Sequence, residues 1–347
     1  MIEVLSSAAL ATVQDHGREG YLRYGVGTAG AMDRLALAVG NLLLGNGDDA
    51  AGIEIPLFPF RIRFIEALDF ALTGADCAAR LGERPVLPWW TTRAQAGDVL
   101  TIGVPANGTR CYLSLAGGVD VPVVLGSRST QLRGGFGGFE GRQLQKGDVI
   151  KAVGSEGQRG HETRGAASVT GAAGGTAFHT GFGAVPPEHA LPAAPCTPSA
   201  QTGETIVRVL PAAEYDCYGA ASIDAFWREG WKVTPQSDRY GYRLAGPELV
   251  PVRTIEKRSH GIVPGVIQVP HSGQPIIQLR DAQPSGGYPK IGTVIEADLW
   301  RLAQARIGTR IRFVQTTYQE AVAALETLDA YLLRVRNLIG LVRSSRH

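Results

Sequence analysis

Two segments of the sequence combine groups that bind anions with clusters of glycine. Residues 14–33 carry Asp15, Arg18 and Asp33 among glycines, whose small size lets the backbone approach a ligand. Residues 125–142 combine arginine and hydroxyl side chains with a Gly-rich loop, a set suited to a carboxylate or a phosphate. The second of these segments supplies the predicted anion-binding residues Arg128, Ser129, Arg133, Gly134, Gly135 and Arg142.

Two later segments carry groups that could act on a polar substrate. Residues 237–249 begin with Ser-Asp-Arg, which predicts an Asx-type turn at Asp238 with Arg239 and Arg243 as its ion-pair partners. Residues 280–294 form a loop between predicted strands, where binding groups commonly lie. This loop offers the directional groups Gln283, Ser285, Gly286, Gly287, Tyr288 and Lys290.

Each segment also has a structural interpretation. The first fits a set of tight β-turns with surface charges, and the second fits a flexible loop with Phe136 and Phe139 in the core. The Asp238 turn fits a structural ion pair as well as a catalytic carboxylate, and the last loop fits a decorated hairpin. The glycine content of the second segment favours a functional role, because glycine loses more conformational freedom on folding than other residues.

The pattern G-x-G-x-x-G at Gly25, Gly27 and Gly30 precedes a predicted helix over 33–44. A dinucleotide site needs a buried parallel strand before this turn and an acidic residue about 20 positions later. Asp33 instead fits the helix N-terminus, where its charge complements the helix dipole and repels an anion. Glu54 lies in a segment with two prolines that predicts an edge strand. We therefore do not expect a dinucleotide site.

Composition excludes several classes of function. The 34 basic and 32 acidic residues nearly balance, so the electrostatics favour neither nucleic acid nor a membrane surface as a partner. Four cysteines without a C-x-x-C pair, and histidines without H-x-H spacing, predict no metal site and no disulfide framework. No apolar run approaches 18 residues, and the N-terminus lacks the basic region of a signal peptide, which favours the cytoplasm.

The chain is predicted to be mainly β, because 45 glycines and 20 prolines divide it into short alternating segments. Periodicity supports helices over 33–44, 296–304 and 318–342. Residues 154–203 are rich in Ala, Gly, Ser, Pro and Thr, a composition typical of a linker. The sequence thus predicts a barrel-like domain over 1–153, a linker or insertion over 154–203, and a second barrel-like domain with a C-terminal helix over 204–347.

At these same segments the sequence resembles the biotin-dependent-carboxyltransferase-like, urea-amidolyase-related family. That family includes the C subunit of bacterial ATP-dependent 5-oxoprolinase, KipA proteins, chains called allophanate hydrolase subunit 2, and part of urea carboxylase. The resemblance covers about 13–152 and 204–324. It is carried by "QDHGREGYLRYGVGTAGAMD", "GADCAARLGERPVLPW", "YLSLAGGVDVPVVLGSRST", "SDRYGYRLAGPEL" and "GIVPGVIQVPHSGQPIIQLRDAQPSGGYPKIGTVIEADLWRLAQ".

The resemblance implies tandem cyclophilin-like β-barrels and an obligate complex with a KipI-like chain. A LamB/YcsF-like chain joins in 5-oxoprolinase, where ATP phosphorylates the lactam oxygen of 5-oxoproline before the ring opens to glutamate. The resemblance thus implies ATP as a cofactor in a site shared with a partner, and a small amide as substrate. In the urea enzyme, biotin carried by a partner delivers carboxylate to an amide nitrogen. A KipA-like regulator would instead bind its partner without turnover.

The same resemblance suggests roles for individual residues. Asp238 would act as a base or orient a donor, and Gln283, Tyr288 and Lys290 would polarise the amide. The anion-binding residues above, together with Arg239, Gln268, Gly286 and Gly287, would hold substrate or phosphate, with Asp15, Arg18 and Asp33 lining the pocket or interface. The family's Gln-Thr-Thr-Gly-Gly-Tyr appears here as "QPSGGY", so Pro284 removes a donor and leaves the activity open.

Overall fold

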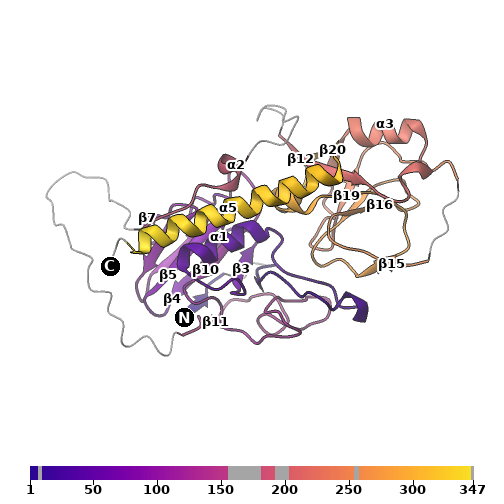
Figure 1. Cartoon of the computed structure of the whole chain (residues 1–347). Helices are drawn as coiled ribbons and strands as arrows, with labels where there is room; N and C mark the ends of the chain where they lie inside the picture. The colour runs from indigo at the N-terminus through magenta and orange to yellow at the C-terminus, as the bar shows by residue number, and fades with distance from the viewer. Residues whose placement is uncertain (7–9, 155–180, 192–202, 254–257, 345–347) are drawn as a thin grey trace.

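The structure, a computed structural model, describes residues 1–6, 10–154, 181–191, 203–253 and 258–344. Figure 1 shows two β-rich bodies side by side, with the C-terminal helix α5 (Tyr318–Ser344) running from one across the other. The first body holds the strands up to residue 150, and the second is a closed barrel formed by strands after residue 203. The prediction of a mainly β chain with few helices and a C-terminal helix is confirmed.

The first body consists of two antiparallel sheets that share one apolar core. In β4, Phe60, Ile62 and Phe64 are buried while Arg61 and Arg63 are exposed, the alternation of a strand with one face on the core. One sheet has the order β11 (Val149–Ile150), β1 (Ile2–Val4), β4 (Phe60–Phe64), β9 (Val99–Ile102), β6 (Arg80–Leu81), β7 (Arg84–Pro85). The other has the order β2 (Thr12–Gln14), β3 (Gly52–Ile55), β10 (Cys111–Leu115), β5 (Leu68–Gly74), β8 (Trp90–Ala94).

The second body is a seven-stranded closed barrel. Closure comes from the parallel pairing of its first and last strands, which leaves no sheet edge exposed. The strand order is β12 (Glu204–Pro211), β19 (Lys290–Val294), β16 (Val266–Gln268), β17 (Ile276–Gln278), β14 (Gly241–Ala245), β13 (Gly230–Val233), β20 (Arg310–Gln315). A separate two-stranded sheet pairs β15 (His260–Gly261) with β18 (Ser285–Gly286).

The three predicted helices are present. Asp33 is the N-cap of α1 (Arg34–Leu44), and its Oδ1 accepts a hydrogen bond of 2.9 Å from the Ala36 N–H. The second predicted helix is divided into the 3-10 turn η3 (Glu296–Asp298) and α4 (Leu299–Gln304). The remaining helices are α2 (Pro187–Ala190), α3 (Ala220–Arg228), η1 (Leu22–Tyr24) and η2 (Tyr215–Cys217).

Helix α3 was not predicted from the sequence. Its side chain Phe226 is fully buried and packs against Trp231 and Phe313 in the barrel core. The helix therefore covers apolar barrel side chains. A third apolar cluster contains Leu35 and Leu43 of α1 and Tyr331 of α5, so α1 is buried between its sheet and α5.

The prediction of an edge strand around Glu54 is wrong. Pro56 and Pro59 lie in the connection between β3 and β4, so neither proline interrupts a strand. Strand β3 lies inside its sheet, between β2 and β10, and Glu54 is only 1% exposed. The segment with two prolines therefore contains two separate strands, β3 and β4. Glu54, the acidic residue of β3, is buried.

The predicted linker over 154–203 is described only in part, because 155–180 and 192–202 lie outside the described residues. Residues 181–191 pack on the first body and on α5. The Thr91 N–H donates to the Phe182 carbonyl (2.9 Å), and the Tyr331 hydroxyl donates to the Val185 carbonyl (2.7 Å). Within the described residues no helix is both long and apolar enough to span a membrane. The domain boundaries proposed from the sequence remain a prediction.

Candidate functional site at the junction of the two bodies

Asp15 connects the first and second sequence segments. Its carboxylate accepts hydrogen bonds from the Gly17 N–H (2.7 Å), the Ser127 hydroxyl (2.6 Å), the Ser129 hydroxyl and the Arg128 N–H. Burial by itself raises the pKa of Asp15, but these hydrogen bonds outweigh it and hold the pKa below its ordinary value. Asp15 therefore stays ionised and fixes the start of the 125–142 loop.

Arg18 supports the same loop from beneath. Its side chain is buried, with Nε donating to the Val124 carbonyl (3.2 Å) and Nη2 to the Ser129 carbonyl (2.6 Å). The guanidinium lies 4.8 Å from the centre of the Phe136 ring, a cation–π contact. Phe139 packs against the core of the first body. Both aromatic residues of the Gly-rich loop are therefore used to hold it in place.

The glycine segment at 25–30 brings the first and fourth segments together. A Cβ on Gly27 would lie 3.0 Å from the Ala282 carbonyl oxygen, so a side chain there would push the barrel loop away. The Thr28 hydroxyl donates to the Arg280 carbonyl (3.3 Å). Gly30 has a φ of +93° and packs on Gly17. These glycines serve close backbone packing between the bodies rather than pyrophosphate binding.

A buried ion-pair network lies at the centre of the junction. Arg239 donates twice to Asp281 (2.9 and 3.0 Å), once to Glu54, and once to the Gly30 carbonyl (2.7 Å). The expected pairing of Arg239 with Asp238 is therefore wrong: the guanidinium turns inward, where two buried carboxylates compensate its charge. The network joins the first, third and fourth segments and links them to β3.

The charges in this network hold each other ionised. Burial by itself raises the pKa of Glu54, but the charges of Arg239 and Arg110 outweigh it and lower the pKa. Burial by itself lowers the pKa of Arg239, but Asp281 and Glu54 outweigh it and raise the pKa. The Tyr112 hydroxyl adds a hydrogen bond of 2.7 Å to Glu54. All of these side chains are buried, so the network is a rigid floor rather than an open site.

Asp33 lies beside this floor and behaves differently. Besides capping α1, its Oδ2 accepts a hydrogen bond of 2.8 Å from the Gln304 amide of the barrel. Burial raises the pKa of Asp33 to about 6, against which the bonds from Gln304 and Ala36 act only partly. No arginine pairs with this carboxylate among the described residues. Asp33 thus links the bodies and titrates near neutral pH.

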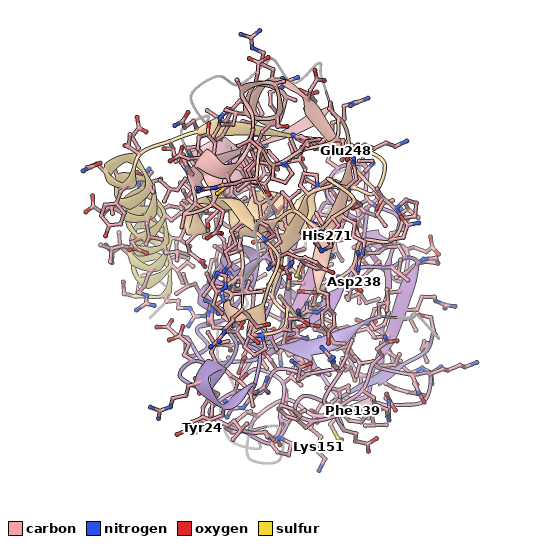
Figure 2. The ribbon with its side chains drawn as sticks, turned by 90° about the vertical axis from the view of Figure 1, so that its right-hand side faces the viewer. Tyr24, Phe139, Lys151, Asp238, Glu248 and His271 are labelled. Carbon is pink, nitrogen blue, oxygen red and sulfur yellow. The ribbon has the colours of Figure 1, made fainter. Side chains whose placement is uncertain are left out.

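Asp238 and Arg133 lie on the rim above the floor. The Oδ1 of Asp238 accepts from the Tyr240 N–H (2.8 Å) and the Gly241 N–H (3.2 Å), which confirms the predicted Asx turn. The side chain is exposed, and Figure 2 shows it in the band between the barrel and the first body. Arg133 extends from its loop over the Tyr240 ring, 5.8 Å from the centre. The second and third segments thus meet at the surface.

Two other predicted anion-binding arginines already have carboxylate partners. Arg142 forms a bidentate ion pair with Asp148 (2.7 and 2.9 Å) and a second ion pair with Glu140. Arg128 pairs with the exposed Asp49 at 3.1 Å. Ser129 is enclosed, while Gly134 and Gly135 are exposed at the loop tip.

The fourth segment presents a mixture of enclosed and exposed groups. Gln268 is buried and accepts a hydrogen bond of 2.9 Å from Gln278. Lys290 is 9% exposed, and its backbone N–H donates to Glu214 (2.9 Å). Gln283 is exposed, and Tyr288 is 45% exposed with an edge-on contact to His271. The amide and phenol therefore face solvent beside the buried polar groups.

The departure at Pro284 is accommodated by the small sheet. The Pro284 carbonyl accepts from the Ile262 N–H (2.9 Å), and the following Ser285–Gly286 pairs with His260–Gly261. A Cβ on Gly286 would meet the Ile262 side chain at 2.5 Å and the Gln268 amide at 2.9 Å, so a larger residue there would displace these two side chains. Gly287 is half-buried beside it.

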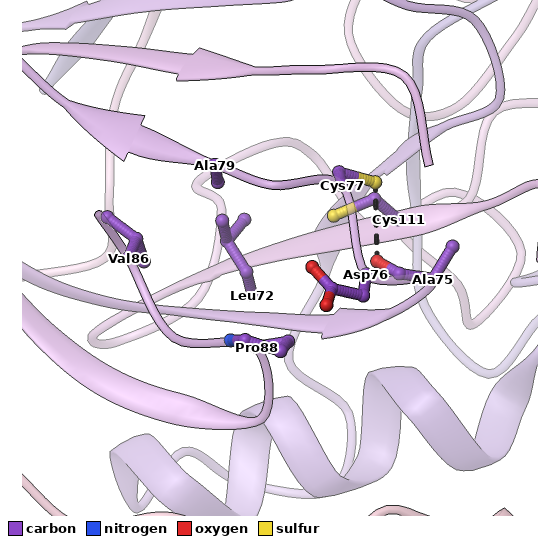
Figure 3. Close-up of a pocket in the computed structure, with 8 residues that line it drawn as sticks. All are labelled: Leu72, Ala75, Asp76, Cys77, Ala79, Val86, Pro88 and Cys111. Carbon is purple, nitrogen blue, oxygen red and sulfur yellow. Dashed lines mark hydrogen bonds between the residues drawn. The ribbon is translucent and has the colours of Figure 1, made fainter. Parts of the chain in front are cut away.

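A small cavity lies elsewhere, in the first body. Figure 3 shows it lined by apolar groups around Leu72 and Val86, with Cys77 and Cys111 at one end. Its volume of about 10 Å³ holds about one water, far less than a substrate needs. The neighbouring Cys77 side chain, followed by burial, raises the pKa of Cys111 well above its ordinary value, so this thiol stays protonated and unreactive.

Sequence reasoning missed several groups at the junction: Glu54, Arg110, Asp281, His16, Arg34 and Arg280. Glu54 was assigned to an edge strand, although an acid within the apolar run "GIEI" indicates a buried, paired carboxylate. Within the described residues, no three His, Cys, Asp or Glu side chains are grouped to hold a metal ion. The junction can therefore present hydrogen-bond donors and the exposed carboxylate of Asp238 to a small polar ligand.

Comparison with known proteins places these features in a family. The family model "Carboxyltransferase domain, subdomain A and B" matches residues 24–315. The chain is 40% identical to the 5-oxoprolinase C subunit of Escherichia coli (strain K12), covering 95% of this chain and 96% of that one. It is 37% identical to the 5-oxoprolinase C subunit of Haemophilus influenzae, covering 98% and 99%.

Among solved structures, the K. lactis urea amidolyase superimposes with a TM-score of 0.83 at 28% identity. The match covers 96% of this chain but 20% of that one, so this chain spans about a fifth of the larger protein. All four junction segments, apart from the start of the first, lie inside the residues matched by the family model. The chain belongs to the carboxyltransferase domain, subdomain A and B, family.

Proposed function

We propose that this chain is the C subunit of a 5-oxoprolinase-type complex that converts 5-oxoproline, ATP and water into glutamate, ADP and phosphate. The observation that carries the proposal is the end-to-end match to two bacterial 5-oxoprolinase C subunits, at 96% and 99% of their lengths. The match to urea amidolyase covers only a fifth of a larger protein. This extent of similarity to the bacterial C subunits favours the hydrolase.

In this proposal the junction positions the lactam. The exposed Asp238 acts as a base or orients a water, and its Asx turn fixes the carboxylate without using both oxygens, because only Oδ1 accepts backbone hydrogen bonds. Gln283, Tyr288 and Lys290 polarise the amide carbonyl as negative charge develops on its oxygen. ATP supplies the phosphoryl group that activates this oxygen, in a site shared with a partner.

The remaining predicted residues hold the anionic part of the substrate or of ATP. Arg133 is exposed, and the exposed Gly134 and Gly135 follow it at the loop tip, although the Gly135 N–H already donates to the Gln131 carbonyl (2.9 Å). To bind the ligand, Arg128 would have to break its ion pair with Asp49. This costs little free energy because Asp49 is 82% exposed. Arg142 has two carboxylate partners and acts in this scheme by holding the loop.

The experiment is reconstitution with partners. The chain is co-purified with the products of its neighbouring genes, expected to include a KipI-like chain and a LamB/YcsF-like chain. We expect ATP hydrolysis that depends on 5-oxoproline and is lost when this chain is omitted. An intact complex that hydrolyses no ATP in the presence of 5-oxoproline contradicts the proposal.

A second candidate is a carboxyltransferase acting on urea or a related amide with biotin on a partner. The observation in its favour is the close superposition on the K. lactis urea amidolyase. The same junction groups would then stabilise charge on the amide that accepts the carboxylate. This candidate predicts a biotinylated protein in the purified complex and urea-dependent ATP hydrolysis, and the absence of both excludes it.

A further inference from the structure

Five arginines among the described residues have a buried guanidinium nitrogen without a hydrogen-bond partner: Arg18, Arg34, Arg110, Arg280 and Arg301. Arg18 supports the 125–142 loop, Arg110 lies 3.8 Å from Glu54 and Arg301 lies 3.4 Å from Asp298, which leaves the Nε atoms of Arg34 and Arg280. Arg280 is 5% exposed, and Arg34 is half-buried at the start of α1. A buried donor without a partner costs free energy, so the native protein normally supplies one. Here two such donors come from different bodies.

The two side chains share one region with His16. Burial, followed by the charge of Arg280, lowers the pKa of Arg34 to about 10. Burial, followed by the charge of Arg34, lowers the pKa of His16, to which Arg280 also contributes. Both effects agree with the three residues lying in one partly buried region, where charges influence one another over several ångströms.

Backbone contacts fix this arrangement independently of charge. The Thr28 hydroxyl donates to the Arg280 carbonyl, and the Thr28 carbonyl accepts from the Arg18 N–H at 2.7 Å. A Cβ on Gly30 would lie 2.9 Å from the His16 carbonyl oxygen. The loop that carries His16 thus packs against the glycine segment that leads into Arg34, and that segment contacts Arg280.

Nearby carboxylates only partly neutralise the cluster. Glu296 pairs with Nη2 of Arg280 at 2.9 Å and is 50% exposed, while the Nε of Arg280 points elsewhere and remains unbonded. The carboxylate of Asp15 already accepts hydrogen bonds from Ser127, Arg128 and Ser129 of the 125–142 loop. Glu19, the other acid that attracts Arg34, is exposed. Two guanidinium N–H donors, at the Nε atoms of Arg34 and Arg280, are therefore left without an acceptor among the described residues.

We propose that Arg34 and Arg280, with His16 beside them, form an oxyanion-binding site at the junction of the two bodies. Two guanidinium groups from different elements match the charge and the forked geometry of a carboxylate or a phosphoryl group. The choice of ligand rests on the proposed function: the oxyanion is the carboxylate of 5-oxoproline or a phosphate released from ATP. The sequence prediction placed anion binding on other arginines.

The test is binding to the isolated full-length chain, which needs no turnover. Inorganic phosphate and 5-oxoproline are titrated separately by calorimetry at constant ionic strength. We expect saturable binding of at least one probe, weakened about tenfold or more in both Arg34→Gln and Arg280→Gln, the loss expected for a charge-assisted hydrogen bond. The probe that binds identifies which of the two oxyanions the site takes.

Arg301→Gln is the matched control. Arg301 also has a buried Nε without a hydrogen bond, but this Nε lies 3.4 Å from Asp298, the guanidinium stacks on Trp300, and neither Arg34 nor Arg280 is among the charges that shift its pKa. We expect the Arg301→Gln variant to bind each probe with the same affinity as the wild type. If Arg280→Gln fails to fold, Arg34→Gln decides, because Arg34 is less buried and has no ion pair among the described residues. Absence of saturable binding of both probes, unchanged affinity in Arg34→Gln, or an equal loss in Arg301→Gln overturns the proposal, whatever the complex hydrolyses.

Discussion

The carboxylate of Glu54 and the guanidinium of Arg239 form a buried ion pair between positions 185 residues apart in the chain. Glu54 lies on a strand of the first body, and Arg239 lies just before β14 of the barrel. Asp281 compensates the other side of the guanidinium. The pair therefore fixes how the two bodies meet, and with them the four segments around the candidate site.

Removing one charge of this pair leaves the other charge buried. We expect Glu54→Gln to lower the free energy of unfolding by about 3 kcal/mol, the order found when a buried pair loses one partner. Urea unfolding followed by tryptophan fluorescence measures the change. Arg63→Ala, which breaks the exposed pair of Arg63 with Glu3, is the control and should cost less than about 1 kcal/mol. Equal losses in the two variants would show that the Glu54 pair is not a special constraint.

The raised pKa of Asp33 predicts that the free energy of unfolding decreases as the pH rises, the opposite of the usual effect of a carboxylate. Its pKa rises on folding from 3.8 to about 6, so the folded state holds the proton more tightly than the unfolded chain. The stabilisation from protonated Asp33 is fully present below about pH 4 and is lost as the pH rises through 6. Asp33→Asn cannot titrate and still caps the helix. Relative to this variant, the wild type should lose about 3 kcal/mol between pH 4 and 7.

The measurement is the free energy of unfolding of both proteins at several pH values, compared as a difference. Groups other than Asp33 titrate in both proteins and cancel in that difference. A difference that stays constant from pH 4 to 7 would mean that Asp33 is as acidic in the folded protein as in the unfolded chain.

We expect the Asp15 carboxylate to order the 125–142 loop locally rather than to stabilise the whole fold. Asp15→Asn loses the charge that accepts from two hydroxyls and two backbone N–H groups. Hydrogen bonds to a charged group contribute about 2 kcal/mol each, so amide exchange at residues 127–130 should accelerate about thirtyfold or more. Ser237→Ala removes a hydroxyl that bonds Arg243 in another turn and should leave this exchange unchanged. Unchanged exchange in Asp15→Asn would show that the Asp15 charge does not order the loop, and that the Arg18 hydrogen bonds and the aromatic contacts are sufficient.

Local patterns were sufficient for much of the fold. The alternation in β4, the helix around Leu35–Leu43 and the Asx turn at Asp238 depend on neighbouring residues, and all three were predictable. The inward turn of Arg239 was not, because its carboxylate partners come from other segments of the chain. Helix α3 was missed because its stability comes from packing Phe226 into the barrel.

The candidate site, like the fold, could be predicted from the sequence only in part. Glycine and polar clusters marked the four segments, but residue type alone could not separate Arg142, which pairs with two carboxylates, from Arg34, which has no ion pair among the described residues and an unbonded Nε. That difference depends on which charges the fold brings near each guanidinium. It was therefore visible only when both bodies were placed together.

The most direct test of the account is the rate of 5-oxoproline-dependent ATP hydrolysis by the complex containing Asp238→Asn. This variant retains the Asx turn, because an asparagine oxygen can accept the same two backbone hydrogen bonds, but it loses the carboxylate charge. Glu248→Gln, an exposed carboxylate on the barrel that Figure 2 shows away from Asp238, is the matched control. We predict that Asp238→Asn assembles normally and turns over at least about a hundredfold more slowly, while Glu248→Gln equals the wild type. Wild-type turnover in Asp238→Asn would contradict the assignment of the junction as the catalytic site.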